Sequence, residues 1–206
     1  MDYPTYEIEE QLIEMGYKYI VGVDEAGRGA LCHCVVAAAV CIPVENISKF
    51  LGKVNDSKKM SPKKREEMFD IINEYCNVGF HNIDAEVIDD INILEATKLS
   101  MRGAVEKIEY YDYILVDGTV DLSNHLVNIP TQKVIKGDAK SISIAAASVI
   151  AKVTRDRMMV ELHDKIPLYS VNKNKGYGTK DHCEAIQTYG PTDYHRLTFG
   201  KVKEFV

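Results

Sequence analysis

The segment Ile20-Val21-Gly22-Val23-Asp24-Glu25-Ala26-Gly27-Arg28-Gly29 joins an apolar run to two adjacent carboxylates and a glycine-flanked arginine. The apolar run is typical of a buried strand, which places Asp24 and Glu25 at its carboxyl end. Carboxylates at such a position suit a hard divalent cation. The turn suits a phosphate, because glycine lets a ligand approach the backbone and the Arg28 guanidinium offers a planar pair of donors. The segment therefore predicts phosphodiester chemistry.

Other apolar runs predict strands, and the segments between them predict helices. The strands are expected at 18–24, 35–42, 78–83, 113–116 and 133–135. The helices are expected at 5–15, 62–76, 84–110, 139–163 and 179–190, with Ser61 and Thr179 as N-caps. Because the early strands are adjacent in the chain and the later ones alternate with helices, we expect a mixed sheet covered by helices. No repeat or linker divides residues 1–206, which we interpret as one domain.

Two further carboxylates are expected near the first pair. Asp117 follows the strand at 113–116 as Asp24 follows its own strand, and Asp138 precedes the long helix. Ligand groups of α/β sheets gather at the carboxyl ends of strands. Glu25 faces away from Asp24 in an ideal strand, but a turn or bulge that starts there could bring it to the same side. The simpler alternatives are a turn at Asp117-Gly118 and a helix N-cap at Asp138.

Clustered carboxylates repel one another unless a cation lies between them. Two Mg²⁺ ions roughly 3.5–4 Å apart are a common solution in enzymes that cleave phosphodiesters. The joint occurrence of acidic residues at three comparable places therefore favours a metal site over three unrelated turns and caps.

Composition sets broader limits on the kind of protein. No apolar run approaches the length of a membrane span, and residues 1–7 lack a signal-peptide pattern, so we expect a cytoplasmic protein. The five cysteines are odd in number and are interpreted as reduced thiols. The formal net charge of −6 argues mildly against a nucleic-acid partner, but lysines and arginines cluster around 58–65 and 133–157. Charge alone therefore leaves the partner open.

Residues 20–40 resemble the opening segment of the ribonuclease HII family. Further blocks match the family in the same order, at 55–61, 91–97, 115–118, 136–157, 176–182 and 195–196. The resemblance covers nearly the whole chain. It implies a ribonuclease H-like fold, with a five-stranded mixed sheet flanked by helices and a small C-terminal helical part at about 165–206 that extends the substrate-binding surface.

The resemblance also implies an activity and its residues. The activity is hydrolysis of RNA in RNA–DNA hybrids and 5′ of ribonucleotides embedded in duplex DNA. Separately, we expect a monomer that binds no membrane, and the sequence implies no protein partner. The expected ligands of two Mg²⁺ or Mn²⁺ ions are Asp24, Glu25, Asp117 and Asp138. The expected substrate contacts are Gly27, Arg28 and Gly29 at the ribose 2′-hydroxyl and phosphate, Tyr177 on the sugar at the junction, and Ser57 and Lys58 at phosphates. Arg28 favours ribonuclease HII over ribonuclease HIII, which typically carries lysine there.

One loop departs from the family pattern Gly-Pro-Leu-Ala-Gly-Pro-Val. This chain has Gly29-Ala30-Leu31-Cys32-His33-Cys34-Val35 instead, and so loses two fixed φ angles. We expect an altered loop geometry, and we hypothesise that His33 adds a titratable group near a substrate phosphate. A zinc site at Cys32-His33-Cys34 is disfavoured, because neighbours in an extended strand face opposite ways and structural zinc takes four ligands.

Three alternatives compete with this interpretation. A nuclease or resolvase of the same fold acting on DNA alone would not need both the glycine-flanked arginine and Tyr177. An inactive hybrid-binding protein is favoured only by the altered loop. A nucleotide-binding protein is disfavoured, because this chain lacks the phosphate-binding motif Gly-x-x-x-x-Gly-Lys-Ser/Thr. His182 and His195 lie in the matching C-terminal blocks and are candidates to face substrate.

Overall fold

A five-stranded sheet forms the centre of the computed structural model, which describes residues 3–126 and 128–206. The strand order is β3-β2-β1-β4-β5. β1 pairs antiparallel with β2 and parallel with β4, while β2–β3 is antiparallel and β4–β5 is parallel. The predicted mixed sheet is confirmed. The strands are β1 (Ile20–Ala26), β2 (Val35–Cys41), β3 (Asn77–Ile83), β4 (Tyr113–Asp117) and β5 (Thr131–Val134).

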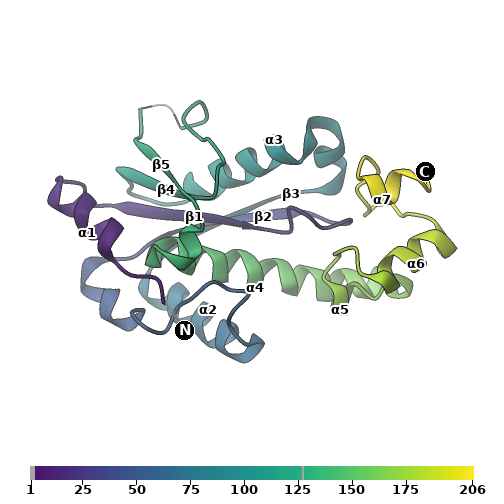
Figure 1. Cartoon of the computed structure of the whole chain (residues 1–206), viewed down its shortest axis with the longest axis horizontal. Helices are drawn as coiled ribbons and strands as arrows, with labels where there is room; N and C mark the ends of the chain where they lie inside the picture. Colours follow the sequence, from purple (N-terminus) through teal and green to yellow (C-terminus); the bar gives the residue numbers. More distant parts are fainter. Residues whose placement is uncertain (1–2, 127) are drawn as a thin grey trace.

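Helices cover both faces of the sheet (Figure 1). α3 (Ala85–Val105) packs on one face, where Ala37 and Ala39 of β2 point toward it. α2 (Pro62–Tyr75) and α4 (Ile142–Lys165) cover the other face, against Ala38 and Val40. All seven β2 residues are therefore buried, which explains why this strand reads as a continuous apolar run instead of an alternating one.

The remaining helical elements are short or peripheral. They are α1 (Glu7–Glu14), η1 (Val44–Lys49), η2 (Gly137–Ala139), η3 (Pro167–Tyr169), α5 (Val171–Asn174), α6 (Lys180–Tyr189) and α7 (Gly200–Lys203). The predicted caps are confirmed, because Ser61 accepts from Lys64 N and Thr179 accepts from His182 N. Within the described ranges, the helices are too short or too polar to cross a bilayer.

Several boundaries differ from the prediction for physical reasons. The helix expected at 84–110 ends at Val105 and is broken at Asn92, where φ is 69°. The Asn92 side chain accepts from Leu94 N and Glu95 N and so caps the second half of α3. The fifth strand spans Thr131–Val134 instead of 133–135, because its polar residues lie at the sheet edge while Ile135 is 62% exposed.

α4 runs alongside β1 for most of the strand. A β-carbon at Gly22 would stand 2.2 Å from the Ser143 carbonyl carbon, and one at Gly27 would stand 1.9 Å from Nε of Arg155. The five steps from Gly22 to Gly27 and the twelve steps from Ser143 to Arg155 both span about 17–18 Å, so the two contacts are compatible with regular strand and helix geometry. Glu9 of α1 accepts from Ser141 Oγ (2.6 Å) and Ser143 N (3.0 Å), which fixes where α4 begins.

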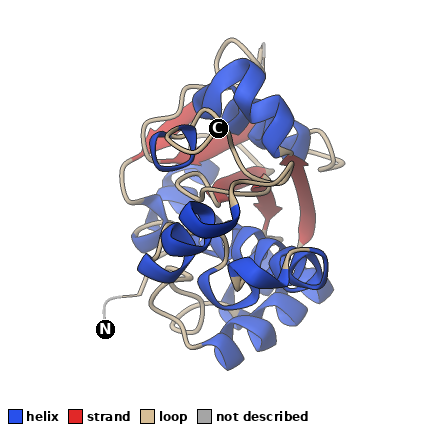
Figure 2. Cartoon of the chain, turned by 90° about the vertical axis from the view of Figure 1, so that its right-hand side faces the viewer, coloured by secondary structure: helices blue, strands red, loops and turns tan. Residues whose placement is uncertain are grey.

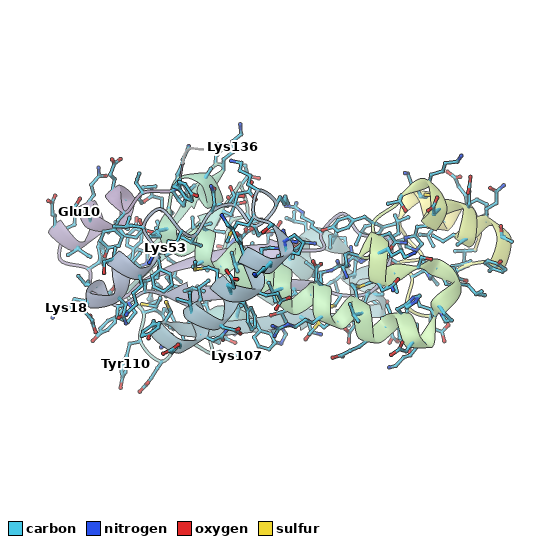
Figure 3. The ribbon with its side chains drawn as sticks, turned by 90° about the horizontal axis from the view of Figure 1, so that it is seen from below. Glu10, Lys18, Lys53, Lys107, Tyr110 and Lys136 are labelled. Atoms are coloured by element: carbon cyan, nitrogen blue, oxygen red, sulfur yellow. The ribbon has the colours of Figure 1, made fainter. Side chains whose placement is uncertain are left out.

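The C-terminal elements form a small group of helices at one end of the sheet, as the end-on view in Figure 2 shows. Their apolar residues pack on Leu31 and Cys32 of the loop between β1 and β2, together with Met159, Ile186 and Val202. Glu10 and Lys18 mark the opposite end of the molecule in Figure 3. The C-terminal helices therefore lie beside the loop that follows Asp24 and Glu25.

Candidate active site

Asp24 and Asp117 occupy corresponding positions on neighbouring parallel strands. Val23 is registered with Val116, so each aspartate is the next residue of its strand. Asp117 Oδ1 accepts the Gly137 N–H at 2.6 Å, which ties the end of β4 to the turn that carries Asp138. The sheet thus brings together the strand ends that the sequence pattern singled out.

Asp24, Glu25 and Asp138 line one cavity of about 400 Å³. β1 continues through Ala26 with regular pairing to β2, so Glu25 lines the cavity without the turn or bulge that the sequence argument considered. Asp24 Oδ1 accepts the Glu25 N–H at 2.7 Å, and Glu25 Oε1 lies 3.8 Å from Nη1 of Arg28. Asp117 is not among the lining residues, but it is held by its bond to Gly137, and its charge raises the pKa of Asp24, Glu25 and Asp138.

The carboxylates disturb one another electrostatically. Burial raises the pKa of Asp24 well above its usual range, and the charges of Glu25, Asp117 and Asp138 raise it further. Burial and the charges of Asp56 and Asp117 raise the pKa of Asp138. Burial also raises the pKa of Glu25, although Arg28 opposes this. An oxygen-rich pocket with an excess of negative charge fits hard divalent cations such as Mg²⁺ or Mn²⁺.

The other predicted contacts form the rim of the same cavity. Nine of the ten predicted site residues line it: Asp24, Glu25, Asp138, Gly27, Arg28, Gly29, Ser57, Lys58 and Tyr177. Ser57 N donates to Ser148 Oγ of α4 (3.3 Å), which places the 57–58 segment beside the carboxylates. Burial lowers the pKa of Lys58, but Asp24, Asp56 and Asp138 together raise it by more.

Lys152 is a lining residue that the sequence argument did not single out. Its Nζ lies 2.7 Å from Asp156 Oδ1 and 5.9 Å from the centre of the Tyr177 ring. The only signal was its membership of the basic cluster at 133–157. Lys152 adds a positive charge to the side of the cavity that Tyr177 occupies.

The loop after Gly29 is not an extended strand at His33. His33 has a φ of 64°, the left-handed region that favours glycine, and its Nδ1 lies 3.0 Å from Cys34 Sγ. The expectation that His33 points away from the thiols was therefore wrong. His33 lines a separate cavity of about 210 Å³ with Asp84, Glu86 and Tyr194. Burial and the nearby Arg155 charge lower its pKa.

His182 and His195 are buried instead of facing the cavity, with exposures of 0% and 1%. Thr192 N donates to His195 Nδ1 (3.0 Å), so the proton of His195 lies on Nε2. His195 Nε2 then donates to His182 Nε2 (3.2 Å), and His182 Nδ1 donates to the Tyr177 carbonyl (3.0 Å). The buried histidine pair thus holds the Tyr177 backbone through its carbonyl.

Cys32 Sγ approaches both histidines, and the three ligand atoms lie within 4.8 Å of one another. Every ring nitrogen of the pair already has a hydrogen-bond partner. Burial raises the pKa of the Cys32 thiol to about 11, which disfavours a thiolate, and the Arg155 guanidinium contacts the Cys32 carbonyl. We therefore interpret this group as hydrogen-bonded packing.

Comparison with known proteins agrees with the geometry. The family model described as Ribonuclease HII matches residues 21–202. Ribonuclease HII of Caldicellulosiruptor bescii is 48% identical over 198 residues, which cover 95% of this chain and 93% of that protein. The crystal structure of ribonuclease H2 from Pyrococcus horikoshii has a TM-score of 0.77 and 26% identity, over 91% of this chain and 96% of that one.

A second solved structure, the PCNA:RNase HII complex from Archaeoglobus fulgidus, has a TM-score of 0.76 and 27% identity over 88% of this chain and 95% of that one. The fold and its carboxylate cluster define a hydrolase of the ribonuclease H-like class. Within that class the sequence match is specific. The chain belongs to the ribonuclease HII family, a family of metal-dependent enzymes that cleave RNA in RNA–DNA hybrids.

Proposed function

We propose that this chain is an endoribonuclease that cuts the RNA strand of RNA–DNA hybrids and also cuts 5′ of single ribonucleotides in duplex DNA. One observation carries the proposal: the Gly27-Arg28-Gly29 turn, the Tyr177 ring and the carboxylates Asp24, Glu25 and Asp138 line the same cavity. A ribose, its phosphate and a cation can therefore be contacted together.

The residues that would hold two Mg²⁺ or Mn²⁺ ions are Asp24, Glu25, Asp117 and Asp138. When bound, the ions supply positive charge at the phosphate and a water that reacts near neutral pH. Water, and not the ribose 2′-hydroxyl, is the attacking group in this proposal. The bond to the 3′-oxygen breaks, so the products carry 3′-hydroxyl and 5′-phosphate ends.

The basic side chains at the rim are suited to hold the phosphate backbone. Arg28 keeps a 43% exposed side chain and only a 3.8 Å ion pair with Glu25, so its guanidinium is free to turn toward a phosphate. Lys58 and Lys152 line the same cavity on other segments. Because these contacts neutralise phosphate charge, substrate affinity should fall steeply with rising salt.

Recognition of the ribonucleotide depends on the 2′-hydroxyl, the one group that separates ribose from deoxyribose. Gly29 leaves open space, since a β-carbon there would meet no atom within 4 Å. Ala30 and Tyr177 form an antiparallel bridge, and Leu31 N donates to the Gly176 carbonyl at 2.8 Å. These bonds fix the turn and the tyrosine relative to each other, so that both can contact one sugar.

The test uses two DNA duplexes that differ in a single ribonucleotide, incubated with Mg²⁺, with the cut position mapped at nucleotide resolution. We expect one cut 5′ of the ribonucleotide and none in the all-DNA duplex. Asp117→Asn keeps an oxygen to accept the Gly137 N–H, so it should fold normally and lose cleavage. Cleavage of both duplexes would indicate a DNA nuclease of the same fold, and binding without cleavage would indicate an inactive hybrid-binding protein.

We further propose that the chain acts as a cytoplasmic monomer and needs no protein partner for cleavage. The Archaeoglobus fulgidus relative was solved together with PCNA, so a sliding clamp is the partner to test first. Light scattering of the purified chain, and cleavage rates with and without added clamp, measure these points. A dimer, or a rate that rises with clamp, would contradict the proposal.

A further inference from the structure

Two arginines are buried beneath the loop between β1 and β2. Arg155 is 1% exposed and Arg196 is 0% exposed. In residues 3–126 and 128–206, neither guanidinium forms an ion pair with a carboxylate. Burial and the neighbouring Arg155 charge lower the pKa of Arg196 to about 10, so it still carries its charge at neutral pH. A buried charge of this kind is costly unless it makes strong hydrogen bonds.

Both guanidiniums donate hydrogen bonds to backbone carbonyls of the loop. Arg196 donates from Nη1 to the carbonyls of Arg28 (3.0 Å) and Ala30 (2.8 Å), and from Nε to that of His33 (2.9 Å). Arg155 donates from Nε to Cys34 (3.0 Å) and from Nη2 to Cys32 (3.3 Å). Five carbonyls between residues 28 and 34 are thus held by two side chains.

Arg155 also reaches the other recognition element. Its Nη1 donates to the Lys175 carbonyl at 2.8 Å, two residues before Tyr177, and its guanidinium carbon lies 5.5 Å from the Tyr177 ring centre. On the opposite side it fills the space next to Gly27, whose φ is +89°. One side chain therefore touches the start of the turn, the end of the loop and the segment of Tyr177.

Backbone hydrogen bonds restrain part of the loop, since Leu31 N donates to the Gly176 carbonyl and His33 N donates to the Tyr194 carbonyl. Residues 29–35 contain no proline, and His33 adopts a left-handed backbone that is unfavourable for a residue with a β-carbon. Hydrogen bonds from charged donors are stronger than neutral ones, and a guanidinium fork can satisfy several fixed acceptors at once. The two arginines thus add charged hydrogen bonds to the neutral backbone bonds that hold the turn and the loop.

We propose that Arg155 and Arg196 are positioning residues that fix the Gly27–Gly29 turn against Tyr177 and thereby set the discrimination between ribonucleotide and deoxyribonucleotide. This inference rests on the proposed function of the turn and Tyr177. Neither arginine lines the carboxylate cavity, so each acts through the backbone that it holds.

The experiment measures discrimination as a ratio of dissociation constants. Asp117→Asn protein with Mg²⁺ is titrated with a duplex containing one ribonucleotide and with the matching all-DNA duplex. Arg196→Lys and Arg155→Lys are then added to this background. Each keeps a positive charge but cannot reach all the carbonyls, so we expect the ratio to fall by about tenfold while all-DNA binding stays nearly constant. Arg102→Lys is the control, because Arg102 forms an exposed ion pair with Glu106 on α3.

A loss of folded protein changes both constants equally and leaves their ratio unchanged, which separates positioning from mere destabilisation. An unchanged ratio in either folded variant would overturn the inference while leaving the proposed function standing. If the Asp117→Asn protein itself binds both duplexes equally, the proposed function fails and the inference fails with it. Two variants on different elements keep the test available should one of them not fold.

Discussion

Gly27 and Arg155 are in direct contact, with the Arg155 Nε occupying the place where a β-carbon of residue 27 would point, 1.9 Å away. Gly29 has no such neighbour within 4 Å, and its φ is not positive. The two glycines of one turn therefore serve different needs. The first is required by the fold, while the second leaves open space at the edge of the carboxylate cavity.

We predict that Gly27→Ala lowers the free energy of unfolding by about 2 kcal/mol or more, from its positive φ and the displaced Arg155. Gly29→Ala should change it by less than about 0.5 kcal/mol yet reduce cleavage at a single ribonucleotide. Urea denaturation and kcat/KM of both variants check this. Equal loss of stability in the two variants would contradict the assignment.

Asp24→Asn should stabilise the metal-free protein while abolishing cleavage. The substitution removes a buried charge that Glu25, Asp117 and Asp138 repel, and the amide oxygen can still accept from Glu25 N. We expect a gain of about 1 kcal/mol or more, measured by denaturation with EDTA present. Asp112→Asn is the control: its carboxylate accepts from Lys18 N and Tyr19 N, so that variant should lose stability. A destabilised Asp24→Asn protein would count against the repulsion argument.

Divalent metal should stabilise the wild-type protein through the same carboxylates. At a concentration one hundred times the dissociation constant, a single bound ion adds about 2.7 kcal/mol to the free energy of unfolding. Thermal unfolding with increasing Mg²⁺ or Mn²⁺ should show a rising Tm in wild type and a much smaller rise in Asp24→Asn. The same rise in both proteins would place the metal elsewhere.

The buried histidine pair should make the protein acid-sensitive. Burial and the adjacent His182 lower the pKa of His195 to about 4, and burial lowers that of His182. Both are neutral in folded and unfolded chains above pH about 6.5, so their contribution is complete there. As pH falls toward about 4, these histidines bind protons in the unfolded chain but not in the folded chain, so the free energy of unfolding decreases. The loss from His195 alone is on the order of 3 kcal/mol.

His195→Gln provides the comparison for this pH dependence. Free energies of unfolding are measured from neutral pH down to about pH 4 for both proteins, so that contributions of the carboxylates cancel in the difference. The variant should be less stable near pH 7, since its link to His182 is altered, but should lose less stability on acidification. Parallel curves would show that His195 does not titrate as its burial implies.

His33→Gly should raise stability by up to about 1 kcal/mol, because glycine adopts a φ of 64° without steric cost. Since His33 lines the cavity of Asp84 and Tyr194 and not that of the carboxylates, the pH profile of cleavage between about pH 5.5 and 8 should stay the same. A shifted profile would support the hypothesis that His33 acts near a substrate phosphate.

Much of the fold could be predicted because the central strands β1, β2 and β4 are buried on both faces. Continuous apolar runs such as Val35–Cys41 leave little ambiguity, and polar residues directly after them mark the site. β5 was misplaced because Thr131, Gln132 and Lys133 carry no apolar signal at the sheet edge. The break at Asn92 depends on a side-chain cap that periodicity does not register.

The burial of Arg155, Arg196 and His195 was missed for a different reason. Arginine and histidine are usually exposed, so the sequence placed Arg155 in a basic cluster and made His195 a candidate to face substrate, with no sign that either is buried. Their burial becomes reasonable only once the carbonyls of residues 28–34 converge on the two arginines, and once His195 pairs with His182, which holds the Tyr177 carbonyl. That convergence joins residues more than 120 positions apart, which no local pattern contains.

α4 begins beside the turn that carries Asp138, passes Lys152 and contacts Gly27, the residue after β1, through Arg155. This one helix thus connects the carboxylate cavity with the loop between β1 and β2. Under the proposed function, a slide of α4 by a fraction of a turn would change the cleavage rate and the sugar selectivity together. Substitutions meant to relax the selectivity should therefore leave α4 in place and alter the residues it carries, one at a time.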